Sequence, residues 1–391
     1  MKKNWIVGLF VCILCSCNHK KQGEEAVVPV ISLDCNQLSS IHDWEILDRL
    51  EIVQLDSDKA LFGDIDRIVR YKDRIYLMDA KKTRAVYIYD FSGKFINEIS
   101  KYGQGPDEYL QLADLYVDPV DTSLNVVTRI DRKIMKYDLD GGELREVIRT
   151  PKTFTRFTQF GDCSIGDMGN YIEDKENPCN VWVMSDKMEP KQQAFPIPES
   201  WESFDLGSRY PFSVYKSNFY YTKALDYTVY QLDGSDGSFF PKCRFDLGGR
   251  SWPEDAKEAQ QYEELRRSNP VCKYVVGFRG FQETGRYLLA PFILDGQQVM
   301  GVYDKKKEKG MVVSLDTYTD EYLMNFGQVI GMDATAVYSL VPAFYLKELW
   351  MGKNAFKDFE LKYPEQIKRL REKFESVDEE GNPFLLVHYL N

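Results

Sequence analysis

A β-strand pattern recurs along this chain at a spacing of about 47 residues, and this period constrains the fold more than any other feature. Matching strand centres lie at Tyr89, Tyr137, Met184 and Tyr230, with offsets of 48, 47 and 46 residues. Apolar and polar residues alternate around them with the period of two that half-buried strands show. Solenoid repeats of this length are helical, so the period indicates the four-stranded blades of a β-propeller.

The number of units predicts the size of the ring. A fifth strand centre, Tyr303, follows Tyr230 by 73 residues, and an inserted segment over about 251–269, predicted to be helical, accounts for the excess. A sixth and less regular unit runs through 328–352. We therefore expect an all-β fold, a six-bladed β-propeller of four-stranded antiparallel blades, within the usual range of four to eight blades.

The two ends of the chain are predicted to close this ring. Residues 50–55 and 384–390 are both strand-like, and we expect a strand from one terminus to complete a blade begun at the other. Apolar residues at spacings of three and four predict an amphipathic helix over about 364–376. This helix therefore precedes the closing strand.

The N-terminus carries an export pattern. Lys2 and Lys3 precede an apolar run over 5–14, and Leu-Cys-Ser-Cys follows at 14–17. The arrangement resembles a bacterial lipoprotein signal, which implies acylation of Cys17 and anchorage by several acyl chains. The apolar run is too short to span a membrane as a helix. An ordinary cleaved secretory signal is the alternative interpretation.

These patterns divide the chain into three parts. We expect a lipoprotein signal peptide over 1–17, a tether and lead-in over 18–45, and the propeller over 46–391. The helical insert at about 251–269 and the helix at about 364–376 lie within the propeller.

Composition excludes several kinds of function. Lys and Arg number 50 against 61 Asp and Glu, a net charge of −11, so no basic excess exists to bind a nucleic acid. Only 3 His leave little material for a His-rich metal site or a Ser-His-Asp triad. The cysteines after the leader have no zinc-binding spacing; free buried thiols are favoured over pairing of Cys163 with Cys179 or of Cys243 with Cys272.

A glycine-rich segment between the first two units contains Gly103, Gly105, Pro106, Glu108 and Tyr109. The glycines permit positive φ, the proline fixes the next turn, and the glutamate is available to accept backbone N–H groups. We interpret these residues as a structural linker between blades. The alternative is that Glu108 and Tyr109 face the central channel and contact a ligand. A third glycine at the spacing of a dinucleotide-binding motif is absent.

This linker is similar to the G-x-G-P-x-E-aromatic linker of the six-bladed β-propeller lipoproteins common in anaerobic Gram-negative bacteria, which are relatives of NHL-type propellers. The lipoprotein pattern at Cys17 and the ending over 382–387 extend the resemblance to nearly the whole chain. The resemblance implies a six-bladed ring and an outer-membrane lipoprotein facing the periplasm or the cell surface. Members of this family mostly lack an assigned activity.

The function predicted from these features is a lipid-anchored, non-catalytic binding or scaffold protein of the cell envelope. Its expected partners are the membrane, through the lipid anchor, and a glycan, a peptide or an envelope protein; no cofactor, catalytic residue or metal ligand is assigned. The alternative is a propeller enzyme of lyase or lactonase type, with a divalent metal in the channel held by carboxylates. Its nominal ligands are Asp79, Glu108, Asp114 and Asp131.

Overall fold

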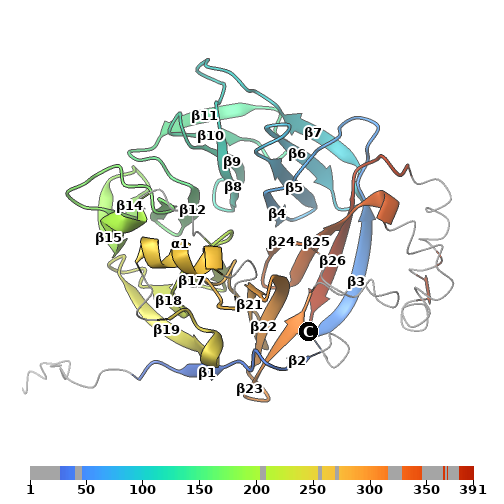
Figure 1. Ribbon diagram of the computed structural model, residues 1–391. Coiled ribbons are helices and arrows are strands. Elements are labelled where there is room, and N and C mark those ends of the chain that lie inside the picture. The colour runs from blue at the N-terminus through green and yellow to red at the C-terminus, as the bar shows by residue number, and fades with distance from the viewer. Residues whose placement is uncertain are drawn as a thin grey trace, which may run out of the picture.

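The computed structural model describes residues 27–39, 46–202, 208–253, 258–268, 273–315, 328–345, 364–365, 368 and 378–391. These residues form six β-sheets arranged as a ring around a central axis (Figure 1). The predicted six-bladed propeller is therefore confirmed. Within this part of the chain, no helix is both long enough and apolar enough to cross a membrane.

The first three blades are four-stranded antiparallel meanders that run in chain order from the axis outward. Their second and third strands are almost wholly buried because neighbouring blades cover both faces, whereas the outer strands are partly exposed. The strands are β4 (Arg67–Tyr71), β5 (Arg74–Asp79), β6 (Ala85–Asp90) and β7 (Phe95–Ile99) in blade 1; β8 (Leu112–Asp118), β9 (Ser123–Thr128), β10 (Lys133–Tyr137) and β11 (Leu144–Arg149) in blade 2; and β12 (Arg156–Phe160), β13 (Cys163–Asp167), β14 (Cys179–Ser185) and β15 (Pro190–Pro196) in blade 3.

Blades 4 and 5 each gain a fifth strand from the N-terminal segment. The strand β1 (Val30–Ser32) pairs in parallel with the outer edge of blade 4, and β2 (Leu38–Ser39) does the same on blade 5. The range 18–45, expected as tether and lead-in, thus supplies two edge strands, because an outer blade edge offers unpaired backbone groups. The other strands are β16 (Phe212–Tyr215), β17 (Asn218–Tyr221), β18 (Thr228–Leu232) and β19 (Phe239–Asp246) in blade 4, and β20 (Gln282–Glu283), β21 (Tyr287–Leu294), β22 (Gln297–Asp304) and β23 (Lys309–Ser314) in blade 5.

Blade 6 closes the ring from both chain ends, as predicted. Its strand order is β24 (Gln328–Met332), β25 (Ala336–Val341), β26 (Phe384–Leu390) and β3 (Leu47–Gln54). The last strand of the chain, β26, runs antiparallel to β3, from Phe384 opposite Gln54 to Leu390 opposite Leu47. The ring therefore cannot open at this blade without separating the two strands.

The repeat period follows the third strand of each blade. The strand centres Tyr89, Tyr137, Met184, Tyr230 and Tyr303 lie on β6, β10, β14, β18 and β22, each of which is third from the axis. In blade 6 this position is taken by β26, which follows a long intervening segment. The regular spacing therefore ends at the sixth unit.

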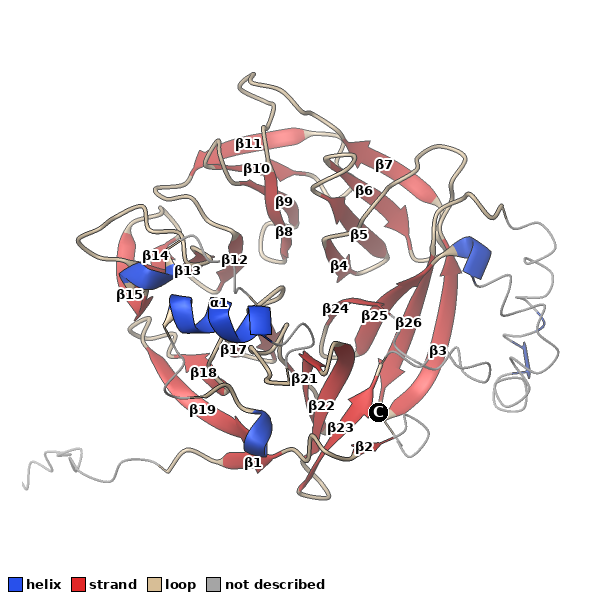
Figure 2. Ribbon diagram, viewed as in Figure 1, coloured by secondary structure: helices blue, strands red, loops and turns tan. Residues whose placement is uncertain are grey.

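Few helices accompany the strands (Figure 2). The predicted insert contains α1 (Ala259–Ser268), whose Tyr262 and Leu265 face the hydrophobic core. Two short 3₁₀ helices, η2 (Glu199–Trp201) and η3 (Gly248–Arg250), lie in the linkers on either side of blade 4. The helix predicted over 364–376 falls largely outside the described residues.

Tyrosine side chains join neighbouring blades. The Tyr76 hydroxyl on β5 donates to the carbonyl of Leu139 in blade 2 at 2.9 Å, and the Tyr89 hydroxyl donates to the carbonyl of Asp56, just after β3 of blade 6, at 3.3 Å. Both rings are fully buried. These two tyrosines therefore serve in blade packing, where an apolar ring and a polar tip both find partners.

A buried histidine at the ring closure makes stability depend on pH. His388 on β26 is fully buried, and burial lowers its pKa to about 3 from 6.5. Between these values the unfolded chain binds a proton that the folded chain does not, so stability rises with pH through this window. We expect wild type to lose about 2 kcal/mol more than His388→Gln between pH 7 and pH 5, measured by denaturant unfolding. Equal losses in both proteins would contradict this assignment.

Candidate functional site

Two adjoining cavities open at one end of the ring axis, where innermost strands begin and second strands end. The register illustrates this arrangement, because Arg156, the first residue of β12, lies opposite Asp167, the last of β13. The axial cavity, of about 700 Å³, is lined by residues of blades 1 to 5. The side cavity, of about 490 Å³, is lined by blades 3 and 4 and by the linker that carries α1. Both include Asp167, Gly169 and Ser208, so they form one continuous site.

Four blades place an arginine at the start of the innermost strand. Arg67 and Arg156 begin β4 and β12, and Arg209 and Arg279 stand just before β16 and β20. The guanidinium carbons of Arg67 and Arg209 lie 5.3 Å and 5.7 Å from the centre of the Tyr210 ring, and the charges of all four arginines act to lower the pKa of Tyr210. Burial outweighs them and raises the pKa of Tyr210, so the phenol stays neutral. Its hydroxyl donates to the carbonyl of Ile330 in blade 6.

Three of these arginines are fixed by the protein. Arg156 donates to the carbonyls of Ala113 at 2.9 Å, Thr155 at 2.7 Å and Arg209 at 3.0 Å. Arg209 donates to the carbonyl of Ile65 at 2.6 Å. The Arg67 Nε atom lies 3.0 Å from the carboxylate of Asp114.

Arg279 is held differently. Its backbone carbonyl accepts the N–H of Tyr210 at 2.8 Å, and its own N–H donates to Pro291 at 2.7 Å. Among the described residues its guanidinium has neither a hydrogen-bond acceptor nor a carboxylate partner. Burial and the nearby charge of Arg209 lower the pKa of Arg279. The guanidinium is therefore an unpaired cation in a partly desolvated position.

The charged lining of the axial cavity is mostly cationic. Among the described residues, five cationic side chains and three carboxylates line it. One of the carboxylates, that of Asp66, lies 3.1 Å from the ammonium group of Lys81. The cations are Lys81, Arg129, Arg156, Arg209 and Arg279, and the carboxylates are Asp64, Asp66 and Asp167.

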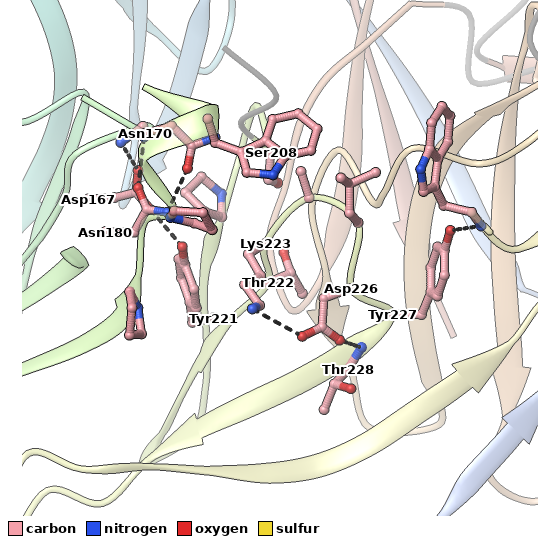
Figure 3. Close-up of a pocket in the computed structure, with 18 of the residues that line it drawn as sticks. Asp167, Asn170, Asn180, Ser208, Tyr221, Thr222, Lys223, Asp226, Tyr227 and Thr228 are labelled. Atoms are coloured by element: carbon pink, nitrogen blue, oxygen red, sulfur yellow. Dashed lines mark hydrogen bonds and ion pairs between the residues drawn. The ribbon is translucent and has the colours of Figure 1, made fainter. Parts of the chain in front are cut away.

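Asp167 stands at the junction of the two cavities (Figure 3). Its carboxylate accepts the Tyr221 hydroxyl at 2.9 Å, the N–H of Gly169 at 2.7 Å and the Thr155 hydroxyl at 3.3 Å. Burial raises the pKa of Asp167, although these bonds and the charge of Arg156 oppose the rise. The side chain is thus held in one orientation at the cavity wall.

Two hydroxyl groups at this site lack partners. Ser208 Oγ, in both cavity walls, and Thr222 Oγ1, in the wall of the side cavity, are buried without a hydrogen-bond partner among the described residues (Figure 3). The Ser208 residue is 9% exposed and Thr222 is 0% exposed. A buried hydroxyl without a partner is costly, at about 1–3 kcal/mol, so these two positions favour a bound group or an ordered water.

Several other polar groups of the side cavity are paired with protein groups. Asp226 accepts the N–H of Thr228 at 2.9 Å and the Tyr230 hydroxyl at 2.7 Å, and lies 3.5 Å from the Lys223 ammonium group. Burial raises the pKa of Asp226, but these partners lower it overall. Asn170 and Asn180 bond to each other, with the Asn180 amide donating to the Asn170 side chain at 2.7 Å.

The tryptophans of the side cavity serve as packed walls. Trp201 and Trp252 are buried, and their rings lie 5.7 Å and 5.1 Å from the ring of Tyr262 on α1. The backbone N–H of Trp252 also donates a hydrogen bond to the Tyr227 hydroxyl at 2.5 Å. Little of either side chain is therefore exposed.

The glycine-rich linker lies between β7 and β8, away from both cavity linings. Glu108 Oε2 accepts the N–H of Gly105 at 2.8 Å, the kind of bond expected from the sequence. The expectation of positive φ at Gly103 and Gly105 is wrong. The glycines instead allow the close approach of the Glu108 carboxylate, because a Cβ added at Gly103 or Gly105 would lie 2.0 Å or 3.0 Å, respectively, from Glu108 Oε2.

Two further side chains complete this linker. Tyr109 is fully buried, and its hydroxyl donates to the carbonyl of Arg84 at 2.6 Å. The Lys133 ammonium group donates to the carbonyls of Gly105, Pro106 and Glu108 at 3.1, 3.2 and 2.9 Å. These contacts hold the chain as it crosses from one blade to the next.

The carboxylates named for a channel metal are dispersed and bonded to protein groups. Asp79 accepts the N–H groups of Gly63 and Lys82, both at 2.8 Å. Asp114 pairs with an arginine, as described, and Asp131 accepts the N–H of Leu110 at 2.6 Å. Within the described residues, no three His, Cys, Asp or Glu side chains are grouped so as to hold a metal ion. The lipidation residue Cys17 lies outside the described residues.

The fold and the continuous polar cavity define a six-bladed β-propeller with its candidate site at one end of the axis. A family model described as "Domain of unknown function (DUF4934)" matches residues 27–389. The chain belongs to this DUF4934 family. The lipoprotein part of the resemblance noted from the sequence stays a prediction.

Solved structures share the fold. A Bacteroides fragilis protein described as exported is 18% identical, with a TM-score of 0.72 over 92% of this chain and 98% of that chain. A DUF4221 family member from Bacteroides vulgatus is 11% identical, with a TM-score of 0.53 over 88% and 97%. No curated protein matches the chain. At these identities the similarity shows the architecture alone.

The geometry of the glycine-rich linker predicts that adding a methyl group at Gly103 lowers the free energy of unfolding. Gly103→Ala places Cβ against the Glu108 carboxylate, so we expect a loss of about 1–3 kcal/mol of unfolding free energy. Gly234→Ala is the matched control, because nothing lies within 4 Å of the Cβ added there. Denaturant unfolding of both variants measures the difference, and similar stabilities would contradict the spatial role of Gly103.

Proposed function

We propose that this protein is a lipid-anchored binding protein of the cell envelope that takes a small ligand into the axial and side cavities. The leader pattern ending at Cys17 supports the anchor. The fold similarity to a Bacteroides fragilis protein described as exported agrees with a place outside the cytoplasm. Residues 18–29 would then form the tether between the acylated cysteine and β1.

The observation that carries the binding role is the pair of buried, unpartnered hydroxyls at Ser208 and Thr222 in the cavity walls. Volumes of about 700 and 490 Å³ are within the usual range for small-molecule sites. The lining residues lie at strand ends and in the linkers between blades, and Arg156, Arg209 and Asp167 are held there by hydrogen bonds to the protein. The site is thus largely formed before a ligand arrives.

Binding is favoured over the lyase or lactonase alternative by the donor arrangement. A channel metal needs several carboxylate or carbonyl oxygens that converge on one point. The described carboxylates named for that role accept hydrogen bonds from different loops, and the axial lining is rich in arginine instead. Arginine repels a cation, so this cavity suits a different ligand.

The anchor is tested by changing the acylated residue. Cys17→Ala should move the full chain from the detergent phase to the aqueous phase and abolish labelling by a fatty-acid analogue in cells. Cys15→Ala is the matched control and should stay labelled. Loss of labelling only in Cys15→Ala, or no labelling of wild type, would contradict acylation at Cys17.

The binding role is tested by blocking the cavity junction. We expect the full chain, incubated with a small-molecule extract of bacterial envelopes, to retain a ligand in native mass spectrometry. Ser208→Trp fills the junction and should abolish retention, while Ser235→Trp, in the exposed turn between β18 and β19, should not. Equal retention by the two variants, or none by wild type, would contradict binding at this site. Circular dichroism checks that both variants are folded.

A further inference from the structure

We infer that the axial and side cavities together select a small hydroxylated organic anion of sugar-acid type. Its oxyanion would lie at Arg279 in the axial cavity and its hydroxyl groups at Ser208, which lines both cavities, and at Thr222 in the side cavity. This inference rests on the proposed binding function and names the ligand class of that same site. Three observations carry it: the charge of the lining, the unpaired guanidinium and the unpartnered hydroxyls.

The charged residues of the axial cavity are mostly positive, whereas the chain as a whole has a net negative charge. The whole sequence has 50 Lys and Arg against 61 Asp and Glu, yet the described lining has five cations and three carboxylates. Asp66 is already paired with Lys81. Gathering arginines in one concave place costs electrostatic repulsion, which a bound anion relieves.

The guanidinium groups differ in their need for a ligand. The guanidinium groups of Arg156 and Arg209 donate hydrogen bonds to backbone carbonyls, and these bonds orient the two guanidinium groups beside the cavity. Among the described residues, Arg129 and Arg279 of the axial lining both keep their side-chain donors free. Of these two, only Arg279 is among the arginines whose charges act on Tyr210, two residues from Ser208. A planar fork of free N–H groups matches a carboxylate or phosphate with two parallel hydrogen bonds. Arg279 is therefore the residue we assign to the oxyanion.

The hydroxyl groups specify the rest of the ligand. Ser208 is two residues from Tyr210, whose N–H donates to the Arg279 carbonyl at 2.8 Å, so these segments lie side by side. From Ser208 the site continues into the side cavity, where Thr222 is buried. A ligand hydroxyl can donate to or accept from each of these side chains. An inorganic anion at Arg279 would leave them unpaired, and a neutral sugar would leave Arg279 unpaired.

Isothermal titration of the full chain in detergent, at low salt, tests this assignment with four probes. D-glucuronate and glucose 6-phosphate carry hydroxyls with a carboxylate or a phosphate; D-glucose lacks the charge, and inorganic phosphate lacks the hydroxyls. We expect at least one sugar anion to bind, with glucose and inorganic phosphate at least tenfold weaker. The preferred sugar anion distinguishes carboxylate from phosphate recognition. Glucose binding as tightly as both anions, or no binding by either anion, overturns the assignment.

Arg279→Gln should weaken binding of the preferred sugar anion at least tenfold, since one charge-assisted contact is lost. Arg145→Gln, on the exposed outer strand β11, is the matched control and should change affinity less than twofold. Unchanged affinity in Arg279→Gln overturns the inference. If native mass spectrometry shows a neutral envelope ligand whose retention Ser208→Trp abolishes, the proposed binding function holds and the anion assignment is wrong. If wild type retains no ligand and binds neither sugar anion, both the binding function and the anion assignment are wrong.

Discussion

The antiparallel pairing of β26 with β3 is the constraint on which the rest of the structure depends. It joins residues 384–390 to residues 47–54, so two chain regions near opposite ends of the sequence complete one blade. Each other blade packs its buried second and third strands between two neighbours, which is possible only in a closed ring. The parallel edge strands β1 and β2 lengthen the N-terminal contact across the outer edges of blades 4 and 5.

Closure also determines where chemistry can occur. All innermost strands begin at the same end of the axis, so residues at those positions meet although they are far apart in sequence. Arg156, Arg209 and Arg279 reach one cavity in this way. Backbone carbonyls orient the guanidinium groups of Arg156 and Arg209, whereas the guanidinium of Arg279 keeps its donors free among the described residues. The cavity is therefore a property of the whole ring, and a single blade would not form it.

The fold could be predicted because the third strands recur at a nearly constant spacing, with buried tyrosines in the first two, Tyr89 and Tyr137. The innermost strands of blades 4 and 5 could not, since β16 has four residues and β20 has two. The axial arginines were missed for a related reason: linkers of unequal length separate Arg156, Arg209 and Arg279 by 53 and 70 residues, which hides their equivalence. In the linker, the role of Glu108 was anticipated, but the glycines are needed for close approach rather than for positive φ.

Hydrogen–deuterium exchange on the full chain, with and without a saturating sugar anion, tests the central claim that the ring presents one ligand site on its axis. Binding there should slow exchange of backbone amides that flank the cavity, at 155–157, 208–211 and 278–281, which come from three separate blades. Exchange in the outer strands β7 and β11 should stay the same. Protection confined to outer strands or to α1, with the axial segments unaffected, would contradict the account.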